Sequence, residues 1–405
     1  MRLSTASMFS TSLSAMLNQQ SKLTDVSLQM STGRRVVTAS DDPSAASQAL
    51  ITRQSLSETK QYADARTTMT QNMALEETIL NSVTSAIQSA QDKLVQAGNG
   101  TLSDSDRLSL ATAMDSIYQE LVGLANSTDG NGNYLFSGSQ TGTVPFGTNA
   151  DGTVSYQGDN NQQFMKVDAS RSMESFDSGL DVFSSITAGA KFVARAEDSN
   201  AGTATFTGPS VSNSADAEYG NDFSIAFQND GAGNITYSVE NLTAGTTTSP
   251  QPYTPGSQIT FGGLSLAVDG TPEDGDSFSV ARGREQDNNF INTLKGVVDA
   301  LSTEQNTDVA RARLSNTLSS ASRQMSNGLD NVLTVRSSVG ARMNEVDVLD
   351  TIGGDRKLAY TDRLSSLVDL DYAEAISEYT LKQTSLEAAQ KTFSQVQRMS
   401  LFDLI

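Results

Sequence analysis

The residues that break helices are concentrated in the middle of this chain, and their distribution limits the possible folds more than any other feature. Six of the 7 prolines lie within 145–272, and 21 of the 30 glycines lie within 130–283. Proline lacks an amide hydrogen and glycine is conformationally free, so both disfavour helices. The flanks, roughly 1–128 and 285–405, are therefore predicted to be helical. The centre is predicted to consist of strands and turns.

Apolar residues in the first flank recur at the three- and four-residue steps of amphipathic helices. One predicted seam consists of Phe9, Leu13, Met16, Gln20, Leu23, Ser27 and Met30. A second seam consists of Met69, Met73, Leu80, Val83, Ile87, Ala90, Leu94 and Ala97, and Glu76 is its one polar interruption. Gly98 to Gly100 is predicted to end that helix, and Ser103 with Asp106 is predicted to open the next one as a capping box.

The second flank shows a strict seven-residue spacing, which is typical of coiled coils and helical bundles. The first series is Leu318, Met325, Val332, Val339 and Val346, and the last helix repeats the spacing with Tyr372, Tyr379, Leu386 and Phe393. We interpret the inner helices, around 69–97 and 314–346, as ordinary core.

The centre changes to a period of two, which indicates antiparallel strands with one buried face. The alternating sets are Phe223, Ile225 and Phe227; Ile235, Tyr237 and Val239; Leu264, Leu266 and Val268; Ile259 and Phe261; and Phe278 and Val280. The predicted fold class is α+β: a discontinuous helical coiled-coil or bundle scaffold from both chain ends, with an inserted antiparallel β region. Four parts are predicted: a terminal coiled coil (1–40 plus 364–405), a helical bundle (41–134 plus 285–363), a small β segment (135–186) and an outer β domain (187–284).

Composition leaves few means for catalysis. The chain has no Cys and no His, which removes thiolate chemistry, the commonest general base and the commonest metal ligand. Its 27 Lys and Arg against 47 Asp and Glu give a net charge of −20, which argues against binding nucleic acid or anionic membranes. We therefore expect no enzyme activity, no cofactor and no metal.

Three short motifs are better explained by local structure than by chemistry. Ser57 to Lys60 matches the S-x-x-K of penicillin-binding enzymes, but the partner motifs are absent and the segment lies in a predicted helix. The first spacings of a calcium loop are present at Asp129, Asn131 and Asn133, but the residues that the rest of such a loop requires are absent. We therefore interpret this segment as a turn. The acidic run 269–276 is predicted to be a hairpin turn.

The terminal helices have thin apolar seams diluted by Ser, Thr and Gln, so they are marginal alone and need a partner. Residues 1–40 carry a net charge of +3 and residues 366–405 carry −3. These helices could pair with each other, with neighbouring subunits, or with both. Head-to-tail contacts of that kind build an open helical assembly.

Distinctive segments lie at both ends of the chain: 28–36 with 39–43, 388–393 and 400–405. These segments resemble the terminal signatures of the bacterial flagellins and their hook–filament junction relatives. Residues 1–5, 134–138 and Pro145-Phe146 favour the junction members of that family. The resemblance implies a non-catalytic structural protein that joins the hook, through the first hook-associated junction protein, to the flagellin filament. The implied partners are that junction protein, flagellin, further copies of the chain and a cytoplasmic export chaperone. The implied location is outside the cell, in the flagellum, reached by flagellar type III export without a cleaved signal peptide.

The predicted assembly interface follows the seams of the terminal helices. Its residues are Phe9, Leu13, Met16, Leu23, Met30, Tyr372, Ile376, Tyr379, Leu386, Phe393 and Val396. From the resemblance, export-chaperone docking is expected at Tyr379, Leu386 and Phe393. Two alternatives remain at this stage: a flagellin that forms the filament itself, and an enzyme or carbohydrate-binding module in the β insert.

Overall fold

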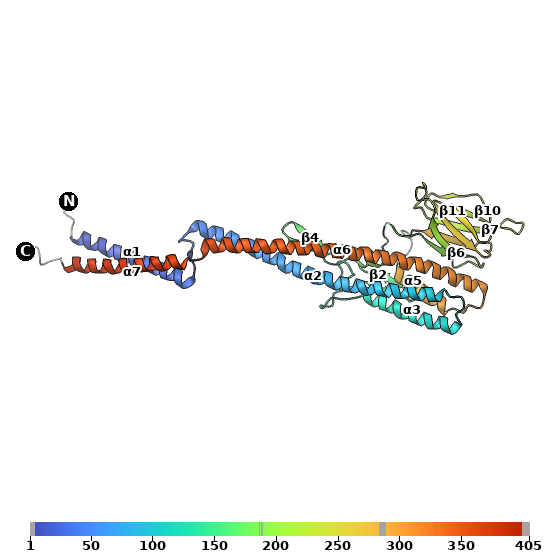
Figure 1. Cartoon of the computed structure of the whole chain (residues 1–405), viewed down its shortest axis with the longest axis horizontal. Helices are drawn as coiled ribbons and strands as arrows, with labels where there is room; N and C mark the ends of the chain where they lie inside the picture. Colours follow the sequence, from blue (N-terminus) through green and yellow to red (C-terminus); the bar gives the residue numbers. More distant parts are fainter. Residues whose placement is uncertain (1–4, 186, 188, 283–288, 399–405) are drawn as a thin grey trace, which may run out of the picture. The chain divides into compact units, whose positions relative to one another are not determined.

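Helices lie at both ends of the chain and antiparallel strands lie between them (Figure 1), which confirms the predicted fold class. The computed structural model describes residues 5–185, 187, 189–282 and 289–398, and leaves out the side chains of 5, 6, 8 and 396–398. The chain divides into two compact units, Met1–Arg66 with Asp347–Ile405, and Thr67–Val346.

The first unit contains the terminal helices α1 (Thr5–Thr32) and α7 (Tyr372–Arg398), together with parts of α2 (Pro43–Ala97) and α6 (Asp308–Val368). The helices α1 and α7 pack side by side (Figure 1). They run antiparallel, because Phe9 near the start of α1 meets Phe393 near the end of α7, and the Tyr372 hydroxyl lies 3.4 Å from the Met30 carbonyl at the opposite ends.

The turn after α1 and the turn before α7 are joined by backbone hydrogen bonds. Gly33 ends α1 with a φ of 68°, a conformation that glycine adopts without strain. Its carbonyl accepts from Leu370 N at 3.1 Å, and Arg35 N donates to the Val368 carbonyl at 2.8 Å. The Asp42 side chain then caps α2 by accepting from Ala45 N at 2.9 Å. The two chain reversals therefore form one structure.

The second unit is built on a helical core formed by α2, α3 (Asp104–Ala125), α5 (Phe290–Ser302) and α6. All eight residues of the predicted second seam and all five residues of the 318–346 heptad series are buried, which confirms their interpretation as core. The predicted capping box is present, since Ser103 accepts from Asp106 N and Asp106 accepts from Ser103 N.

A small β segment follows α3. It consists of two hairpins, β1 (Phe146–Thr148) with β2 (Val154–Tyr156) and β3 (Phe164–Asp168) with β4 (Arg171–Glu174), and of the short helix α4 (Gly179–Phe183). The aromatic ring of Phe183 contacts those of Phe136, Phe146 and Phe290, so this segment shares a core with α5.

The larger β region contains two antiparallel sheets. One has the order β10-β8-β7-β13-β5 with β9 beside β8, and the other has the order β11-β12-β6. The bounds are β5 (Val193–Ala196), β6 (Thr205–Val211), β7 (Phe223–Asn229), β8 (Ile235–Asn241), β9 (Thr246–Thr247), β10 (Gln251–Pro252), β11 (Ser257–Phe261), β12 (Leu264–Asp269) and β13 (Ser277–Ala281). Apolar side chains of both sheets form one buried cluster. Of the five predicted alternating sets, only Ile235 and Tyr237 are not fully buried, because β8 is flanked on its outer side only by the two-residue strands β9 and β10.

Polar side chains of α6 hold the inserted segments through backbone hydrogen bonds. Asn316 accepts from Phe206 N at 3.1 Å and donates to the Ala204 carbonyl at 2.9 Å, and Asn327 bonds both backbone groups of Lys191 in the same way. These bonds satisfy backbone groups that would otherwise be buried without partners.

We expect Asn316→Ala to lower the free energy of unfolding by about 2–4 kcal/mol, because it leaves one buried N–H and one buried carbonyl unsatisfied. Urea unfolding followed by circular dichroism measures this loss. Asn344→Ala, an exposed position on the same helix, is the matched control. Equal unfolding midpoints for the two variants would show that the Asn316 bonds contribute nothing.

Candidate assembly surface

The apolar contact between α1 and α7 is thin and only partly shielded from water. The Phe9 and Phe393 rings lie 5.0 Å apart between centroids, and Phe9 is still 41% exposed. The other half-buried apolar side chains of the predicted interface are Leu13, Met16, Leu23, Met30, Tyr379 and Leu386. Two helices alone therefore do not complete the burial of these side chains.

The predicted seam of α1 is wrong at two positions. Gln20 and Ser27 are exposed, and the buried line passes through Gln19 and Val26. Burial of Val26 removes apolar surface from water, which Ser27 cannot do. The Gln19 side chain donates to the Lys382 carbonyl at 3.3 Å, so a polar residue is satisfied within the seam. A seam through Gln19 and Val26 keeps the three- and four-residue spacing as well as a seam through Gln20 and Ser27 does. Periodicity alone therefore could not distinguish the two seams.

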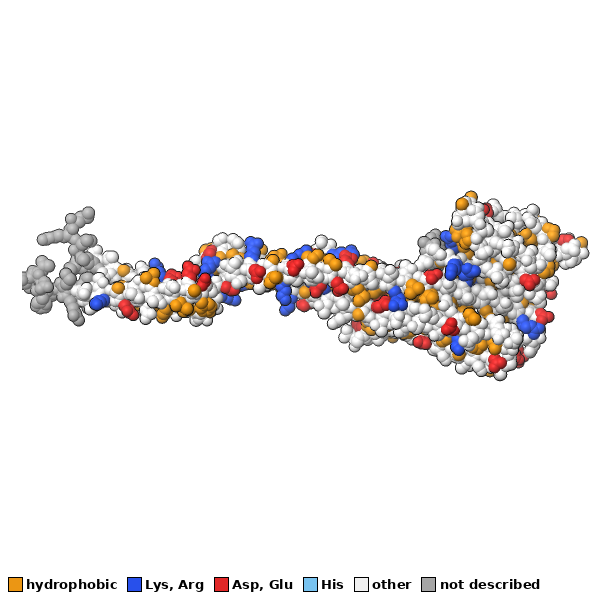
Figure 2. All heavy atoms as spheres, viewed as in Figure 1, with side chains coloured by type: hydrophobic (Ala, Val, Ile, Leu, Met, Phe, Trp, Pro, Cys, Tyr) orange, Lys and Arg blue, Asp and Glu red, His pale blue; other side chains and the backbone are white. Residues whose placement is uncertain are grey.

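A second set of apolar residues in the first unit faces solvent. Tyr372 and Ile376, both predicted for the interface, are about half exposed. The Tyr372 hydroxyl still reaches the Met30 carbonyl of α1, whereas Ile376 lies outside the α1–α7 seam. Further exposed apolar side chains on the same helices are Leu17, Leu28 and Leu381, and on α2 and α6 they are Leu50, Ile51, Val348, Ile352 and Leu358. Figure 2 shows apolar side chains at the surface of the helices. The side chain of Val396 lies outside the described residues. These exposed apolar residues are candidates for contacts with other molecules.

A buried acidic cluster in the second unit was not predicted, although Glu76 was visible as the polar interruption of an apolar seam. Glu76 accepts from Asp177 N at 3.0 Å, and its second carboxyl oxygen has no hydrogen-bond partner in the described chain. Arg342 pairs with Asp177 and, at 3.4 Å, with Glu174. Burial, assisted by the Asp177 charge, raises the pKa of Glu76 to about 8. Because Glu76 is fully buried, we assign the cluster a structural role.

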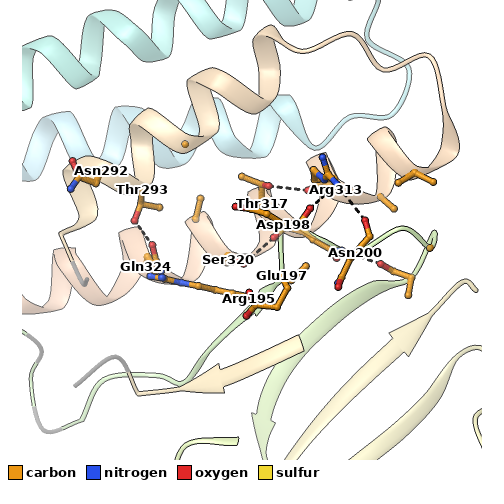
Figure 3. A pocket seen from close by; sticks show the side chains of 18 of the residues that line it. Arg195, Glu197, Asp198, Asn200, Asn292, Thr293, Arg313, Thr317, Ser320 and Gln324 are labelled. Atoms are coloured by element: carbon orange, nitrogen blue, oxygen red, sulfur yellow. Dashed lines mark hydrogen bonds between the residues drawn. The ribbon is translucent and has the colours of Figure 1, made fainter. Parts of the chain in front are cut away.

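A polar cavity of about 280 Å³ lies where the strands meet α5 and α6 (Figure 3). Its polar groups bond mainly to one another. Arg313 donates to the Asp198 carbonyl at 2.9 Å, and Ser320 donates to the Ala194 carbonyl at 2.6 Å. Thr293 and Gln324 are also hydrogen-bonded. The residues around the cavity therefore hold the β region on the helices α5 and α6.

The carboxylates of the two acidic motifs accept backbone N–H groups and fix the local chain. The predicted hairpin turn at 269–276 is wrong, because β12 and β13 belong to different sheets and the segment connects the two sheets. Asp129 accepts from the backbone N–H groups of Asn131 and Asn133, both at 2.8 Å. Asp276 accepts from Ala201 N at 2.8 Å and from Gly202 N at 3.0 Å. In the part of the chain that the structure describes, no group of three or more acidic residues is arranged to hold a metal ion. None of the described helices is long and apolar enough to cross a membrane.

Paired helices from the two chain ends, with apolar faces left exposed and a β region inserted between them, define a flagellin-like assembly subunit. The family models "Bacterial flagellin N-terminal helical region" and "Bacterial flagellin C-terminal helical region" match residues 3–141 and 323–405. The chain is 34% identical over 405 residues to flagellar hook-associated protein 3 of Salmonella typhimurium, covering 100% of this chain and 99% of that protein. It is 36% identical over 409 residues to the Escherichia coli protein of the same name, with the same coverage. The chain belongs to the flagellar hook-associated protein 3 family, whose members are structural proteins of the flagellum.

A solved structure supports the same assignment. The flagellar junction protein FlgL from Legionella pneumophila is 27% identical and superposes with a TM-score of 0.64, covering 80% of this chain and 100% of that chain.

Proposed function

We propose that this protein forms the junction between the flagellar hook and the filament by non-covalent helical assembly. The observation that carries the proposal is the similarity to hook-associated protein 3 over the full length, which includes the terminal helices. A tube made of one subunit type repeats a single interface indefinitely. A junction subunit instead presents one face toward the hook side, where the first hook-associated junction protein ends, and another face toward flagellin.

The terminal helices are the proposed assembly elements. Residues 1–40 plus 364–405 act as the terminal coiled coil, 41–134 plus 285–363 as the bundle, 135–186 as its attached β segment, and 187–284 as the outer domain. The half-buried seam holds α1 on α7, and the exposed apolar residues contact neighbouring subunits. Support comes from the partial burial of Phe9 and Phe393, which a further helix would complete.

The same C-terminal helix is the proposed docking site for a cytoplasmic export chaperone. Tyr379, Leu386 and Phe393 are half-buried on the side of α7 that faces α1. A chaperone bound there competes with α1 for the same side chains. This competition would keep the subunit from assembling before export to the cell exterior, a route that uses no cleaved signal peptide.

Seeded assembly tests the junction role. Hook fragments that already carry the first junction protein are mixed with this protein and then with flagellin, and growth is followed by electron microscopy. We expect a short terminal zone that stops, with flagellin growing only from coated ends. If the protein extends alone into long filaments, it is a filament flagellin instead.

A further inference from the structure

The second unit contains an open groove whose charge is opposite to that of the chain. The groove has a volume of about 710 Å³ and lies between α6, the turn after α2, the start of α3 and strand β6. Its lining contains four cations, Arg107, Lys191, Arg311 and Arg323, and no acidic residue among the described residues. The chain as a whole has a net charge of −20, so a groove whose charged lining residues are all cations differs from the average surface of this protein. We call it the α6 groove.

Two of the cations have no carboxylate partner in the described chain. The Lys191 ammonium donates to the Ser326 hydroxyl at 3.0 Å, and Arg323 donates to the Pro209 carbonyl at 3.2 Å. Burial lowers the pKa of Arg323, because its charge is partly removed from water. A nearby anion would offset that loss of hydration. Both side chains therefore remain available for an acidic ligand.

The other two cations are paired with carboxylates that are largely exposed. Arg107 pairs with Asp104, and Arg311 pairs with Asp308. The Nε of Arg107 is buried without a hydrogen-bond partner in the described chain. The pair of Arg311 with Asp308 is exposed on both sides, and pairs of that kind contribute little and exchange readily with other anions. The Arg107 side chain is mostly buried and also donates to the Leu102 carbonyl, so it adds positive charge to the groove without being free to change partners. A ligand could therefore pair directly with Arg311, Lys191 and Arg323.

The spacing of the cations favours an extended ligand. Arg311 and Arg323 are twelve residues apart on α6, which is about 18 Å at 1.5 Å per residue. One phosphate cannot reach both, whereas about six residues of extended peptide span this distance. Between them, Ser315, Ser319 and Ser322 line the groove and supply neutral hydroxyl groups.

The lining also argues against nucleic acid and free phosphate. It contains no aromatic residue on which a base could stack. The N-terminus of α3, which could otherwise bind a phosphate, already uses the carboxylate of Asp106 and the Ser103 hydroxyl in its capping box. In the acidic run 269–276, Asp274 accepts from Asn229 N and Asp276 accepts from Ala201 N of the same chain, so this run of a second copy is a poor source of the ligand.

We propose that the α6 groove binds an extended acidic peptide segment of a different protein. Carboxylates of the segment pair with Arg311 toward one end and with Lys191 and Arg323 toward the other. This site is separate from the terminal helices of the first unit, so the proposal does not depend on the assembly mode.

Fluorescence anisotropy of a labelled octaglutamate peptide with the full-length monomer tests the proposal. We expect binding at low salt that weakens at least tenfold in about 1 M salt, and no binding of octaglutamine. The double variant Lys191→Glu/Arg311→Glu should bind octaglutamate at least about tenfold more weakly. Arg53→Glu/Lys60→Glu makes the same change in net charge at exposed positions outside the groove and should have no effect.

Three results would overturn the proposal: no binding to the wild-type protein, equal weakening in both double variants, or tighter binding of a uronate polysaccharide or an oligonucleotide of equal charge. Because Lys191 contacts Ser326, the single variant Arg311→Gln provides a second test with little risk to folding. The Arg311→Gln variant is expected to lose part of the affinity for octaglutamate. Because the Arg311 side chain is exposed, the unfolding temperature of the variant is expected to stay unchanged.

Discussion

Replacing Ile376 and Leu381 with serine is expected to prevent incorporation into a growing assembly and to leave the unfolding of the free monomer unchanged. Both side chains are more than half exposed in the single chain. Their replacement therefore removes little intramolecular burial. In the proposed assembly, burial of the exposed part of each side chain would contribute about 1–2 kcal/mol per subunit. Loss of both would reduce the equilibrium constant for subunit addition by at least about 20-fold.

The matched control is Val211→Ser/Leu242→Ser, two apolar residues with similar exposure in the β region. Incorporation is measured in the seeded assay by sedimentation and electron microscopy, and monomer stability is measured by thermal unfolding. Loss of incorporation in the control as well would indicate a general solubility effect and would argue against a specific interface on α7.

A variant of the seam between α1 and α7 separates the two kinds of apolar residue. Leu386 and Phe393 are half-buried within the chain, so Leu386→Ser/Phe393→Ser is expected to reduce monomer helicity as well as incorporation. If both α7 variants changed the monomer equally, the distinction between an internal seam and an external face would be wrong.

Residues that repeat regularly could be placed from sequence. The 318–346 heptad series and the 69–97 seam lie in the core because their spacing matches the helical period and every member is apolar or small. The thin seam of α1 was harder, since Gln19 and Gln20 are chemically identical and only the partner helix distinguishes them. The separation of Ile376 from Tyr379 on α7 likewise depends on where α1 lies.

Contacts that depend on tertiary structure could not be predicted from the amino-acid sequence. Asn316 lies in an ordinary polar context, and its backbone partners are more than a hundred residues away. The four cations of the α6 groove come from three separate segments of a chain whose net charge indicates the opposite property. Glu76 is the intermediate case. Its place in an apolar seam marked it as unusual, but Asp177 and Arg342 could be identified only in the folded chain.

Glu76→Gln is expected to stabilise the protein in alkaline solution by a few kcal/mol. Burial raises the pKa of Glu76 from 4.5 to about 8, so the folded state binds a proton more tightly than the unfolded state. The resulting stabilisation is complete below about pH 4.5 and is lost as the pH rises toward 8. A single group of this kind changes the free energy of unfolding by about 1.4 kcal/mol per pH unit within that window.

The glutamine side chain keeps the shape of the protonated acid and carries no charge at any pH. It therefore avoids two buried carboxylates, at positions 76 and 177, beside the single guanidinium of Arg342. The difference in unfolding free energy between wild type and Glu76→Gln is expected to grow from pH 5 to pH 8.5. Urea unfolding at a series of pH values measures this difference.

The neighbouring Glu77 provides the control, because it is partly exposed and pairs with Arg336. Glu77→Gln removes that ion pair. The free energy of unfolding of this variant should therefore be lower than that of wild type by about the same small amount at every pH in the range. Parallel pH profiles for wild type and Glu76→Gln would contradict the assignment, because a protonated Glu76 in the folded state requires them to diverge. A profile that diverges only for Glu76→Gln would show that one proton, held between α2 and the segment before α4, helps to fix the β segment on the helical core.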